Sequence, residues 1–305
     1  MPKPVYDFAD LQNWRDITAS ENFPLKLSVF GDPVAHSKSP PMHNAALEAC
    51  GIAARYCRLH IRAPELAHAL RLLVRNDFIG TNVTIPHKAA ALALVDDADD
   101  HARRAGGVNT IRVEGEKLVG FSTDGPGLVC AIQEEFGAAL CDLRVLILGA
   151  GGGAGRAIAM QCALEKCPRL VLMNRTMEKL REFAPELEKL MPAHSLMIEH
   201  WDDAAIAARI PGVDLLINCS PVGMKSSDPP PIAPAWIESR LLVYDTVYTA
   251  SRTPLLRAAD QAGARSANGL SMLLHQGALA FEIWFGRQAP MDAMRAGLMQ
   301  AVAAD

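Results

Sequence analysis

The sequence predicts an α/β fold of two domains, in which the second domain is a doubly wound parallel sheet. The first observation is the length of 305 residues, since one domain takes roughly 150. The second is that strand-like and helix-like segments alternate after about residue 25. The third is the order strand, glycine loop, helix, strand from Arg144 onward, which is typical of a right-handed βαβ unit.

The first domain covers residues 1–124 and begins with a polar lead-in over residues 1–25, in which we expect one short helix. The elements expected after it are strands at 27–30, 55–61 and 81–85, helices at 40–50 and 64–75, and a pair of short strands between 107 and 124. Prolines mark the start of the first helix after the lead-in, and Gly51 follows its end. Pro86 ends the third strand, because proline cannot donate to a sheet.

The second domain covers residues 125–268, and residues 269–305 form C-terminal helices. Apolar, strand-like runs predict strands at 144–148, 170–173, 195–199, 213–218 and 241–245, with helices at 156–166 and 177–190. The repetition of strand, helix and strand implies that these strands lie parallel in one sheet.

The composition excludes several classes of protein. Apolar residues make up 50% of the chain and charged residues 21%, which excludes disorder, collagen and coiled coil. The net charge of −4 comes without a block of like charge, so no nucleic acid and no membrane surface is expected as a partner. The N-terminus has no apolar stretch of a secretory signal, and no run reaches the roughly 18–20 apolar residues of a spanning helix.

Cysteine and histidine usage indicates a cytoplasmic protein without a metal. The seven cysteines are scattered, with no Cys-x-x-Cys pair, so we expect buried, reduced thiols rather than a disulfide framework or structural zinc. The nine histidines show no zinc-binding spacing, and no metal is predicted.

A glycine loop follows the strand at 144–148 and opens a helix. Its residues Gly149-x-Gly151-x-x-Ala154 fit the pattern Gly-x-Gly-x-x-Gly/Ala of dinucleotide sites. Gly149 permits the tight turn, Gly151 lets a pyrophosphate approach the backbone, and Ala154 lets helix and strand pack closely. The predicted cofactor contacts of this loop are Gly149, Ala150, Gly151, Gly152, Gly153 and Ala154. The alternative is a flexible glycine loop that binds nothing.

The end of the next strand distinguishes NADP from NAD. An NAD site usually has Asp or Glu there to accept both ribose hydroxyls, whereas this chain has Asn174-Arg175-Thr176 and then Lys179. An arginine suits a 2′-phosphate, whose charge a carboxylate would repel. NADP is therefore the predicted cofactor, and NAD is less favoured. In the alternative interpretation, Arg175 and Lys179 are solvated charges at a helix start.

Three polar clusters in the first domain follow predicted strands, and a hydrophobic core would not need them. They are His36-Ser37-Lys38-Ser39-Pro40, Asn82-Val-Thr84-Ile-Pro-His-Lys88 and Thr123-Asp124-Gly125-Pro126. Their hydroxyl, amide and amine groups suit a hydroxylated ligand. Each cluster also has a structural interpretation: the serines are common loop residues, Lys88 is a solvated lysine at a helix start, and Asp124 caps the following helix.

Five segments together resemble the shikimate dehydrogenase family, in order and at suitable spacing. They are Gly31-Asp-Pro-Val-Ala-His-Ser-Lys-Ser-Pro40 with His43-Asn44; Asn82-Val-Thr-Ile-Pro-His-Lys88; Gly107-Val-Asn-Thr110; Thr123-Asp124; and Asn268-Gly269 with Met272-Leu273 and Gln276-Gly277-Ala278. The glycine loop, Asn174-Arg-Thr176, the run Asn218-Cys-Ser-Pro-Val-Gly-Met224, and Tyr248 before Thr253-Pro-Leu-Leu256 extend the resemblance, which covers about residues 27 to 286.

The resemblance implies an N-terminal α/β substrate domain, a Rossmann-type doubly wound nucleotide-binding domain, and C-terminal helices returning to the first, with the active site in the cleft between the domains. Lys88 and Asp124 match the family's catalytic pair. The residues that match substrate contacts are Ser37, Ser39, Thr84, Asn109, Tyr248 and Gln276. The residues that match cofactor contacts are Asn174, Arg175, Thr176 and Lys179 at the adenosine phosphate, and Thr246 and Gly269 toward the nicotinamide.

Three features depart from the family's usual pattern. Ser122 replaces an asparagine before Thr-Asp, and Gly107 replaces a common alanine. The glycine loop, Gly149–Arg156, is one residue longer than the usual form. These departures bear on subgroup and substrate preference more than on the reaction class.

The implied function is the NADP-dependent, reversible reduction of 3-dehydroshikimate to shikimate, a step of chorismate and aromatic amino acid biosynthesis. NADPH delivers hydride to the ketone carbon, Lys88 supplies a proton to the oxygen, and Asp124 holds the hydroxyl. Two alternatives stay open: a quinate/shikimate dehydrogenase that uses NAD or NADP, and a non-catalytic ligand-sensing protein of the same fold. We expect a small-molecule partner (shikimate, 3-dehydroshikimate or quinate) and a monomer or homodimer.

Overall fold

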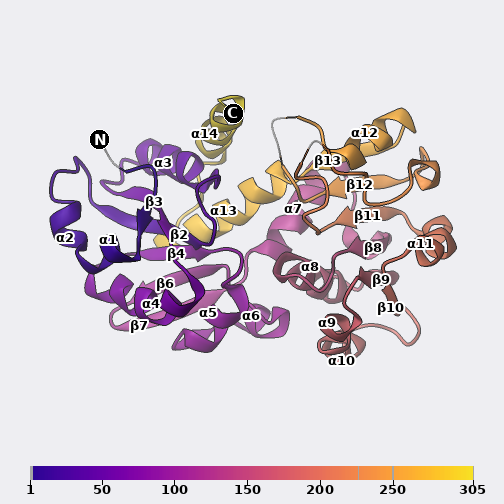
Figure 1. Cartoon of the computed structure of the whole chain (residues 1–305), viewed down its shortest axis with the longest axis horizontal. Helices are drawn as coiled ribbons and strands as arrows, with labels where there is room; N and C mark the ends of the chain where they lie inside the picture. Colours follow the sequence, from indigo (N-terminus) through magenta and orange to yellow (C-terminus); the bar gives the residue numbers. More distant parts are fainter. Residues whose placement is uncertain (1–2, 226, 249–250, 305) are drawn as a thin grey trace. The chain divides into compact units, whose positions relative to one another are not determined.

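The computed structural model describes residues 3–225, 227–248 and 251–304 (Figure 1). Contacts between residues divide the chain into two compact units. Unit 1 comprises residues 1–123 and 276–305, and unit 2 comprises residues 124–275. The second boundary lies within helix α13 (Leu270–Phe285), so the end of that helix belongs to the same unit as the N-terminus.

Unit 1 is built on a seven-stranded sheet with the strand order β1-β3-β2-β4-β6-β7-β5. Its strands are β1 (Tyr6–Asp7), β2 (Leu25–Gly31), β3 (Arg55–His60), β4 (Gly80–Val83), β5 (Asp97–Ala98), β6 (Thr110–Glu114) and β7 (Lys117–Phe121). Its helices are α1 (Phe8–Gln12), α2 (Trp14–Ile17), α3 (Ser39–Ala49), η1 (Ala63–Glu65), α4 (Leu66–Arg75), α5 (Lys88–Leu94), α6 (Asp100–Ala105) and α14 (Met291–Ala303). Strand β6 is antiparallel to β4 and β7, which confirms the predicted strand pair, and the remaining pairings are parallel.

The C-terminal helix α14 packs on α3 of the same unit (Figure 1). Gly297 permits this approach, because a side-chain carbon there would lie 2.7 Å from Ala45 Cβ and 2.7 Å from the Pro41 carbonyl oxygen. The predicted return of the C-terminal helices to the first domain is therefore confirmed.

The N-terminal segment is part of the sheet and of the core, so the expectation of a polar lead-in is wrong. Strand β1 pairs in parallel with β3. Tyr6, Leu11 and Trp14 are buried, and the Trp14 ring lies 5.1 Å from that of Tyr6 and 5.3 Å from that of Phe78. The sequence does not reveal this, because polar residues separate the buried side chains and no apolar run marks the segment.

Unit 2 contains a six-stranded, fully parallel sheet with the strand order β10-β9-β8-β11-β12-β13. Its strands are β8 (Arg144–Leu148), β9 (Arg169–Asn174), β10 (Leu196–His200), β11 (Leu215–Asn218), β12 (Leu242–Asp245) and β13 (Arg265–Asn268). Its helices are α7 (Asp124–Phe136), η2 (Leu140–Asp142), α8 (Gly153–Leu164), α9 (Met177–Arg181), α10 (Ala184–Glu188), α11 (Asp203–Arg209), η3 (Ile210–Gly212), η4 (Pro234–Trp236), α12 (Pro254–Gln261) and the start of α13. The strand order reverses between β8 and β11, and ligands of such sheets bind beyond the carboxyl ends of the strands at that point.

Both faces of this sheet are covered, which confirms the doubly wound prediction. On one face, Leu146 of β8 belongs to a buried cluster with Leu255 of α12. On the other face, the Tyr244 ring of β12 lies 6.4 Å from the Phe136 ring of α7, and its hydroxyl shares a 3.0 Å hydrogen bond with Ser271 of α13.

Several short elements differ from the prediction. The helix expected at 177–190 is divided into α9 and α10, because Pro185 in the first turn of α10 cannot donate into a preceding turn. The sequence also did not reveal the short helix α11, or β13 at the edge of the sheet. Cys130 and Cys141 are exposed, so the expectation of buried thiols is wrong for these two cysteines. None of the helices in the described part of the chain is long and apolar enough to cross a bilayer.

Candidate functional site

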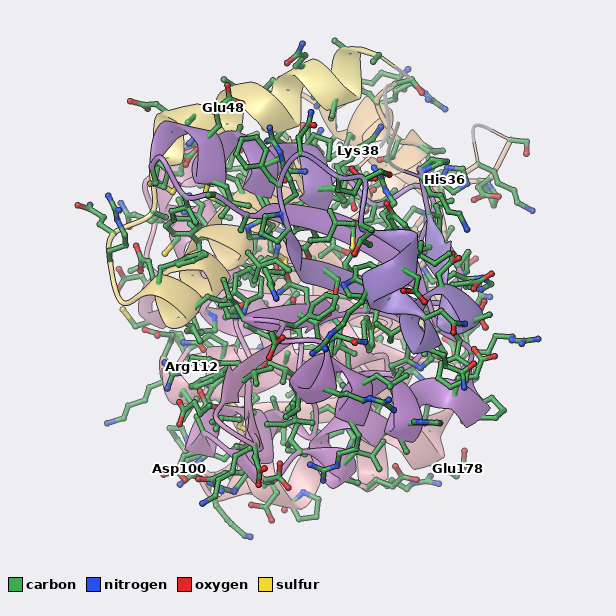
Figure 2. All side chains as sticks on the ribbon, turned by 90° about the vertical axis from the view of Figure 1, so that its left-hand side faces the viewer. His36, Lys38, Glu48, Asp100, Arg112 and Glu178 are labelled. Carbon is green, nitrogen blue, oxygen red and sulfur yellow. The ribbon has the colours of Figure 1, made fainter. Side chains whose placement is uncertain are left out.

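The loop between β2 and α3 presents the hydroxyls of Ser37 and Ser39. Ser39 is the first residue of α3, and its amide donates to Ser37 Oγ at 3.3 Å. The Arg58 guanidinium of β3 donates to the Ser37 carbonyl at 2.7 and 3.1 Å, which fixes the loop against the sheet. Lys38, labelled near His36 in Figure 2, donates to a carbonyl of α14 at 3.0 Å. Sequence reasoning missed Arg58, since no motif joins it to a loop 21 residues away.

Thr84 and Lys88 lie on one turn between β4 and α5. The His87 amide donates to the Thr84 carbonyl at 2.9 Å, and Lys88 is the half-buried first residue of α5. Gly31 at the end of β2 makes room for this turn, because a side-chain carbon there would lie 2.6 Å from Thr84 Cγ2. The positive end of a helix dipole disfavours a cation, so helix stability does not explain a lysine at this position.

Asn109 is the centre of a buried hydrogen-bond network beside β6. Its Nδ2 donates to Thr123 Oγ1 at 2.9 Å and to Gln276 Oε1 at 3.4 Å, and its Oδ1 accepts from the Thr123 amide at 2.8 Å. Asn82 Nδ2 donates to the Asn109 carbonyl at 3.1 Å, and the Tyr56 hydroxyl donates to Asn82 Oδ1 at 2.8 Å. The fold thus brings together two predicted substrate contacts, Asn109 and Gln276, that are 167 positions apart in the chain.

The glycine loop of unit 2 closes on the end of β9. Gly149 has a φ of +74°, and a side-chain carbon there would lie 2.9 Å from Ser220 Cβ. At Gly151 a side-chain carbon would lie 2.8 Å from Lys179 Cβ and 2.9 Å from Asn174 Nδ2. Glycine at these two positions therefore lets the loop backbone approach neighbouring strand ends, as a dinucleotide site requires.

Close packing of α8 requires glycine at Gly155, which sequence reasoning missed, while the packing role of Ala154 stays a prediction. A side-chain carbon at Gly155 would lie 2.6 Å from the Gly149 carbonyl oxygen and 2.8 Å from Ala150 Cα. Gly152 and Gly153 are exposed at the N-terminus of the 12-residue α8, where backbone amides attract an anion.

The end of β9 carries Asn174, Arg175 and Thr176 where an NAD site carries a carboxylate. Asn174 Oδ1 accepts from the Gly151 amide at 3.3 Å, and its Nδ2 donates to the Thr176 carbonyl at 2.8 Å. Arg175 is exposed, and its Cζ lies 5.0 Å from the centre of the Trp201 ring. Sequence reasoning missed Trp201, which directly follows the neighbouring strand β10.

Thr246 and Gly269 follow the ends of the neighbouring strands β12 and β13. A side-chain carbon at Gly269 would lie 2.1 Å from the Thr246 carbonyl oxygen, so only glycine fits there. Thr246 Oγ1 donates to the Asn218 carbonyl at 2.8 Å. Tyr248 is half-buried, and burial raises the pKa of its hydroxyl.

Sequence reasoning also missed Asp245, a fully buried carboxylate at the end of β12. It accepts from Asn218 Nδ2 at 2.9 Å, from the Val247 amide at 3.1 Å and from Thr253 Oγ1 at 2.6 Å, while burial raises the pKa of the carboxyl. These bonds hold the loops that follow β11 and β12. An acidic residue at the end of an apolar strand is the signal that could have found it.

Asp124 is buried at the first position of α7 in unit 2. A carboxylate there is stabilised by the helix dipole, so the structural interpretation of Asp124 agrees with this placement as well. The charge of Asp124 also acts on the thiol of Cys219. Burial raises the pKa of this thiol, and the charges of Asp245 and Asp124 raise it further.

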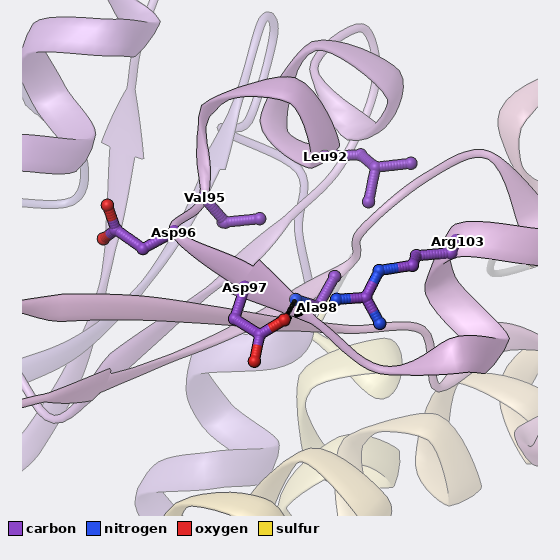
Figure 3. A pocket seen from close by; sticks show the side chains of 6 residues that line it. All are labelled: Leu92, Val95, Asp96, Asp97, Ala98 and Arg103. Atoms are coloured by element: carbon purple, nitrogen blue, oxygen red, sulfur yellow. Dashed lines mark hydrogen bonds and ion pairs between the residues drawn. The ribbon is translucent and has the colours of Figure 1, made fainter.

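A cavity of about 310 Å³ in unit 1 is separate from all these residues (Figure 3). It is lined by Leu92, Val95, Asp96, Asp97, Ala98 and Arg103. Arg103 forms an ion pair with Asp97, and none of the predicted site residues lines the cavity. In the described ranges, no group of three His, Cys, Asp or Glu side chains is arranged to hold a metal ion.

Comparison with known proteins gives the family. Residues 29–111 match the shikimate dehydrogenase substrate binding domain, and residues 269–299 match the shikimate 5′-dehydrogenase C-terminal domain. A shikimate dehydrogenase (NADP(+)) of Symbiobacterium thermophilum is 38% identical over 279 residues, which cover 90% of this chain and 94% of that one. The chain belongs to the shikimate dehydrogenase family.

Solved structures of the family share the fold of this chain. A shikimate dehydrogenase in complex with NADP⁺ has a TM-score of 0.85 and 33% identity, over 92% of this chain and 96% of that one. A Thermus thermophilus shikimate 5-dehydrogenase in complex with NADP(H) and shikimate has a TM-score of 0.80 and 33% identity, over 91% and 99%. The resemblance found in the sequence is confirmed, whereas the roles of the individual residues stay predictions.

Proposed function

We propose that this protein is an NADP-dependent shikimate dehydrogenase, which reduces 3-dehydroshikimate to shikimate and also catalyses the reverse reaction. The observation that carries the proposal is the strand end Asn174-Arg175-Thr176, which lies beside Gly151. Relatives of this chain in the same family are named shikimate dehydrogenase (NADP(+)). In this proposal residues 1–124 and 269–305 hold the substrate, and residues 125–268 hold the nucleotide. The proposal also places this enzyme in the cytoplasm, as a monomer or a homodimer.

The residues of unit 2 fit a dinucleotide that carries a 2′-phosphate. Gly151 lets the loop backbone pack closely on Asn174 and Lys179, where a side-chain carbon would lie 2.9 and 2.8 Å from their atoms, and such a close turn is typical of a dinucleotide loop. Gly152 and Gly153 add the positive end of α8. Arg175 and Lys179 supply positive charge for the phosphate. NADPH, when bound, supplies the hydride for the ketone carbon.

Lys88 and Asp124 supply the acid–base chemistry in this proposal. As the ketone is reduced, negative charge develops on its oxygen, and the Lys88 ammonium donates a proton to that oxygen. The Asp124 carboxylate accepts a hydrogen bond from the resulting hydroxyl and favours the charged form of the lysine. In the reverse direction, a neutral Lys88 accepts the proton of the alcohol.

The remaining polar groups orient the substrate. Ser37 and Ser39 offer hydroxyls to its carboxylate. Both lie on one loop, which Arg58 fixes against the sheet. Thr84, Asn109, Gln276 and Tyr248 bind its hydroxyls. Asn109 suits this role because its bonds with Thr123 hold the amide in one orientation.

Steady-state assays of the purified full-length chain test the proposal. Shikimate and quinate are each combined with NADP and with NAD, and reduced nicotinamide is followed by its absorbance. We expect the fastest turnover with shikimate and NADP. A preference for quinate or for NAD would favour a quinate/shikimate dehydrogenase. Binding of shikimate without turnover under any of the four conditions would instead indicate a ligand-sensing protein.

A further inference from the structure

We infer that Trp201 is a positioning residue for cofactor choice, because its ring holds Arg175 ready for a 2′-phosphate; the inference rests on the proposed use of NADP. The topology explains why the two side chains meet. Arg175 directly follows β9 and Trp201 directly follows β10, which are neighbouring parallel strands with Asn174 opposite His200. The Trp201 amide also donates to the Asn174 carbonyl at 3.2 Å, which joins the two strand ends.

The contact leaves the hydrogen-bonding edge of Arg175 available. The guanidinium carbon lies 5.0 Å from the centre of the indole ring, within the range of a cation–π contact. Such a contact depends on the charge of the guanidinium, whose N–H donors keep their capacity for hydrogen bonds. In the part of the chain that the structure describes, no hydrogen bond or ion pair engages this guanidinium. Its donors can therefore bind the oxygens of a phosphate.

Trp201 can act as a firm support because it is anchored in unit 2. Its side chain is half-buried and packs against the hydrophobic cluster that contains Ile206 and Leu146. Arg175, by contrast, is exposed at the end of a strand and would otherwise sample many rotamers. The ring restricts this motion before the ligand arrives, so less conformational entropy is lost on phosphate binding.

The consequence is selective for the phosphate. A ligand with a 2′-phosphate gains from an ordered Arg175, whereas a ligand without this phosphate gains nothing from it. Loss of the indole ring is therefore expected to weaken binding of the first ligand and to leave the second almost unchanged. A ring that served only to stabilise the fold would affect both ligands alike.

Calorimetric titration of the full chain with 2′,5′-ADP and with 5′-AMP tests this without turnover. Trp201→Leu keeps apolar contact with the cluster but removes the aromatic face. The Kd of 2′,5′-ADP is expected to rise about two- to fivefold, which is the range of a cation–π contact at an exposed site, with a smaller rise for Trp201→Phe. The Kd of 5′-AMP is expected to change by less than about 1.5-fold from that of the unaltered protein, which is smaller than the effect of a cation–π contact.

A double-variant cycle and a matched control complete the test. In an Arg175→Leu background, Trp201→Leu is expected to change the Kd of 2′,5′-ADP no further, because the group it positions is gone. Trp236→Leu is the control, since Trp236 is also partly buried against the same cluster. It is expected to lower thermal stability without altering the ratio of the two Kd values.

Three results would overturn the inference: an equal loss for both ligands, the same loss in the Arg175→Leu background, or no preference of the unaltered protein for 2′,5′-ADP. Failure of the proposed function has a different signature. It would appear as absent shikimate oxidation by the unaltered protein, whatever the titrations show.

Discussion

Lys88 and Asp124 both occupy the first position of a helix, yet the helix dipole acts on them in opposite senses. It stabilises the carboxylate of Asp124 and disfavours the ammonium of Lys88. The helix dipole therefore gives Asp124 a structural reason to be there and gives Lys88 none. The lysine is thus the sharper test of the proposed chemistry at the scale of single residues.

Lys88→Ala is expected to reduce kcat by about 10²–10⁴, which is the usual contribution of a positioned acid–base group, with a smaller effect on the KM of shikimate. Steady-state kinetics at saturating NADP measure both constants. Lys117→Ala is the control, because Lys117 is an exposed lysine of strand β7 in the same unit. A kcat within a few-fold of the unaltered protein would remove Lys88 from the mechanism.

His43 of α3 is a buried histidine that gives unit 1 a pH-dependent stability. Both ring nitrogens lack a hydrogen-bond partner among the described residues, and the ring stacks on Tyr56 with centroids 4.5 Å apart. Burial lowers the pKa of the imidazole from 6.5 to about 3. Between these values the unfolded chain binds a proton that the folded chain does not, so the free energy of unfolding decreases as the pH falls.

His43→Phe is expected to flatten this dependence, since the variant has no group to protonate on unfolding. The slope of the unfolding free energy between pH 6 and pH 4.5 should decrease by up to about 1.4 kcal/mol per pH unit. Urea unfolding at several pH values measures the slope, with the exposed His194→Asn as control. An unchanged slope in His43→Phe would assign the pH dependence to other groups.

At the scale of elements, the sequence predicts best where one strand carries its own apolar signal. The run Arg144–Leu148 and its glycine loop were sufficient to predict the βαβ unit, and the strand-end motifs followed from it. Asp245, Arg58 and Trp201 could not be predicted, because their roles come from contacts with neighbouring elements rather than from local pattern. The N-terminal segment was missed for the same reason, since its burial depends on β3 and Phe78.

Trp14→Ala tests whether this N-terminal segment contributes to the core of unit 1. Trp14 is 4% exposed, so its truncation is expected to lower the free energy of unfolding by about 3–5 kcal/mol. Ile17→Ala in the same helix is the control, because Ile17 is 39% exposed. Urea unfolding of both variants measures the difference. Equal, small losses would mean that the segment lies on the unit without stabilising it.

At the scale of the whole molecule, the proposed reaction draws on residues of both units. Lys88, the serine loop and Asn109 belong to unit 1, whereas Asp124 and the glycine loop belong to unit 2. Cofactor choice and substrate choice are therefore separable properties, because different parts of the chain supply the groups. In the proposal, substrate choice depends chiefly on the serine loop of unit 1, which binds the carboxylate.

Quinate and shikimate differ at that end of the molecule. Quinate has a saturated ring with an added hydroxyl beside its carboxylate, whereas shikimate has a flat, unsaturated carbon there. Ser37 and Ser39 are the proposed contacts of the carboxylate. Ser37 Oγ already accepts from the Ser39 amide at 3.3 Å. In the proposal both serine hydroxyls donate to the carboxylate, so neither keeps a donor for the added hydroxyl of quinate.

We expect kcat/KM for shikimate to exceed that for quinate by at least about tenfold. Burying an unmatched hydroxyl costs about 1–3 kcal/mol, and 1.4 kcal/mol corresponds to a factor of ten. The two substrates are compared side by side with NADP on one preparation, so that the active fraction cancels from the ratio. The serines add hydroxyls rather than bulk, so quinate is disfavoured by unpaired polarity and not by size. A ratio near one, or one that favours quinate, would place the protein among the quinate/shikimate dehydrogenases.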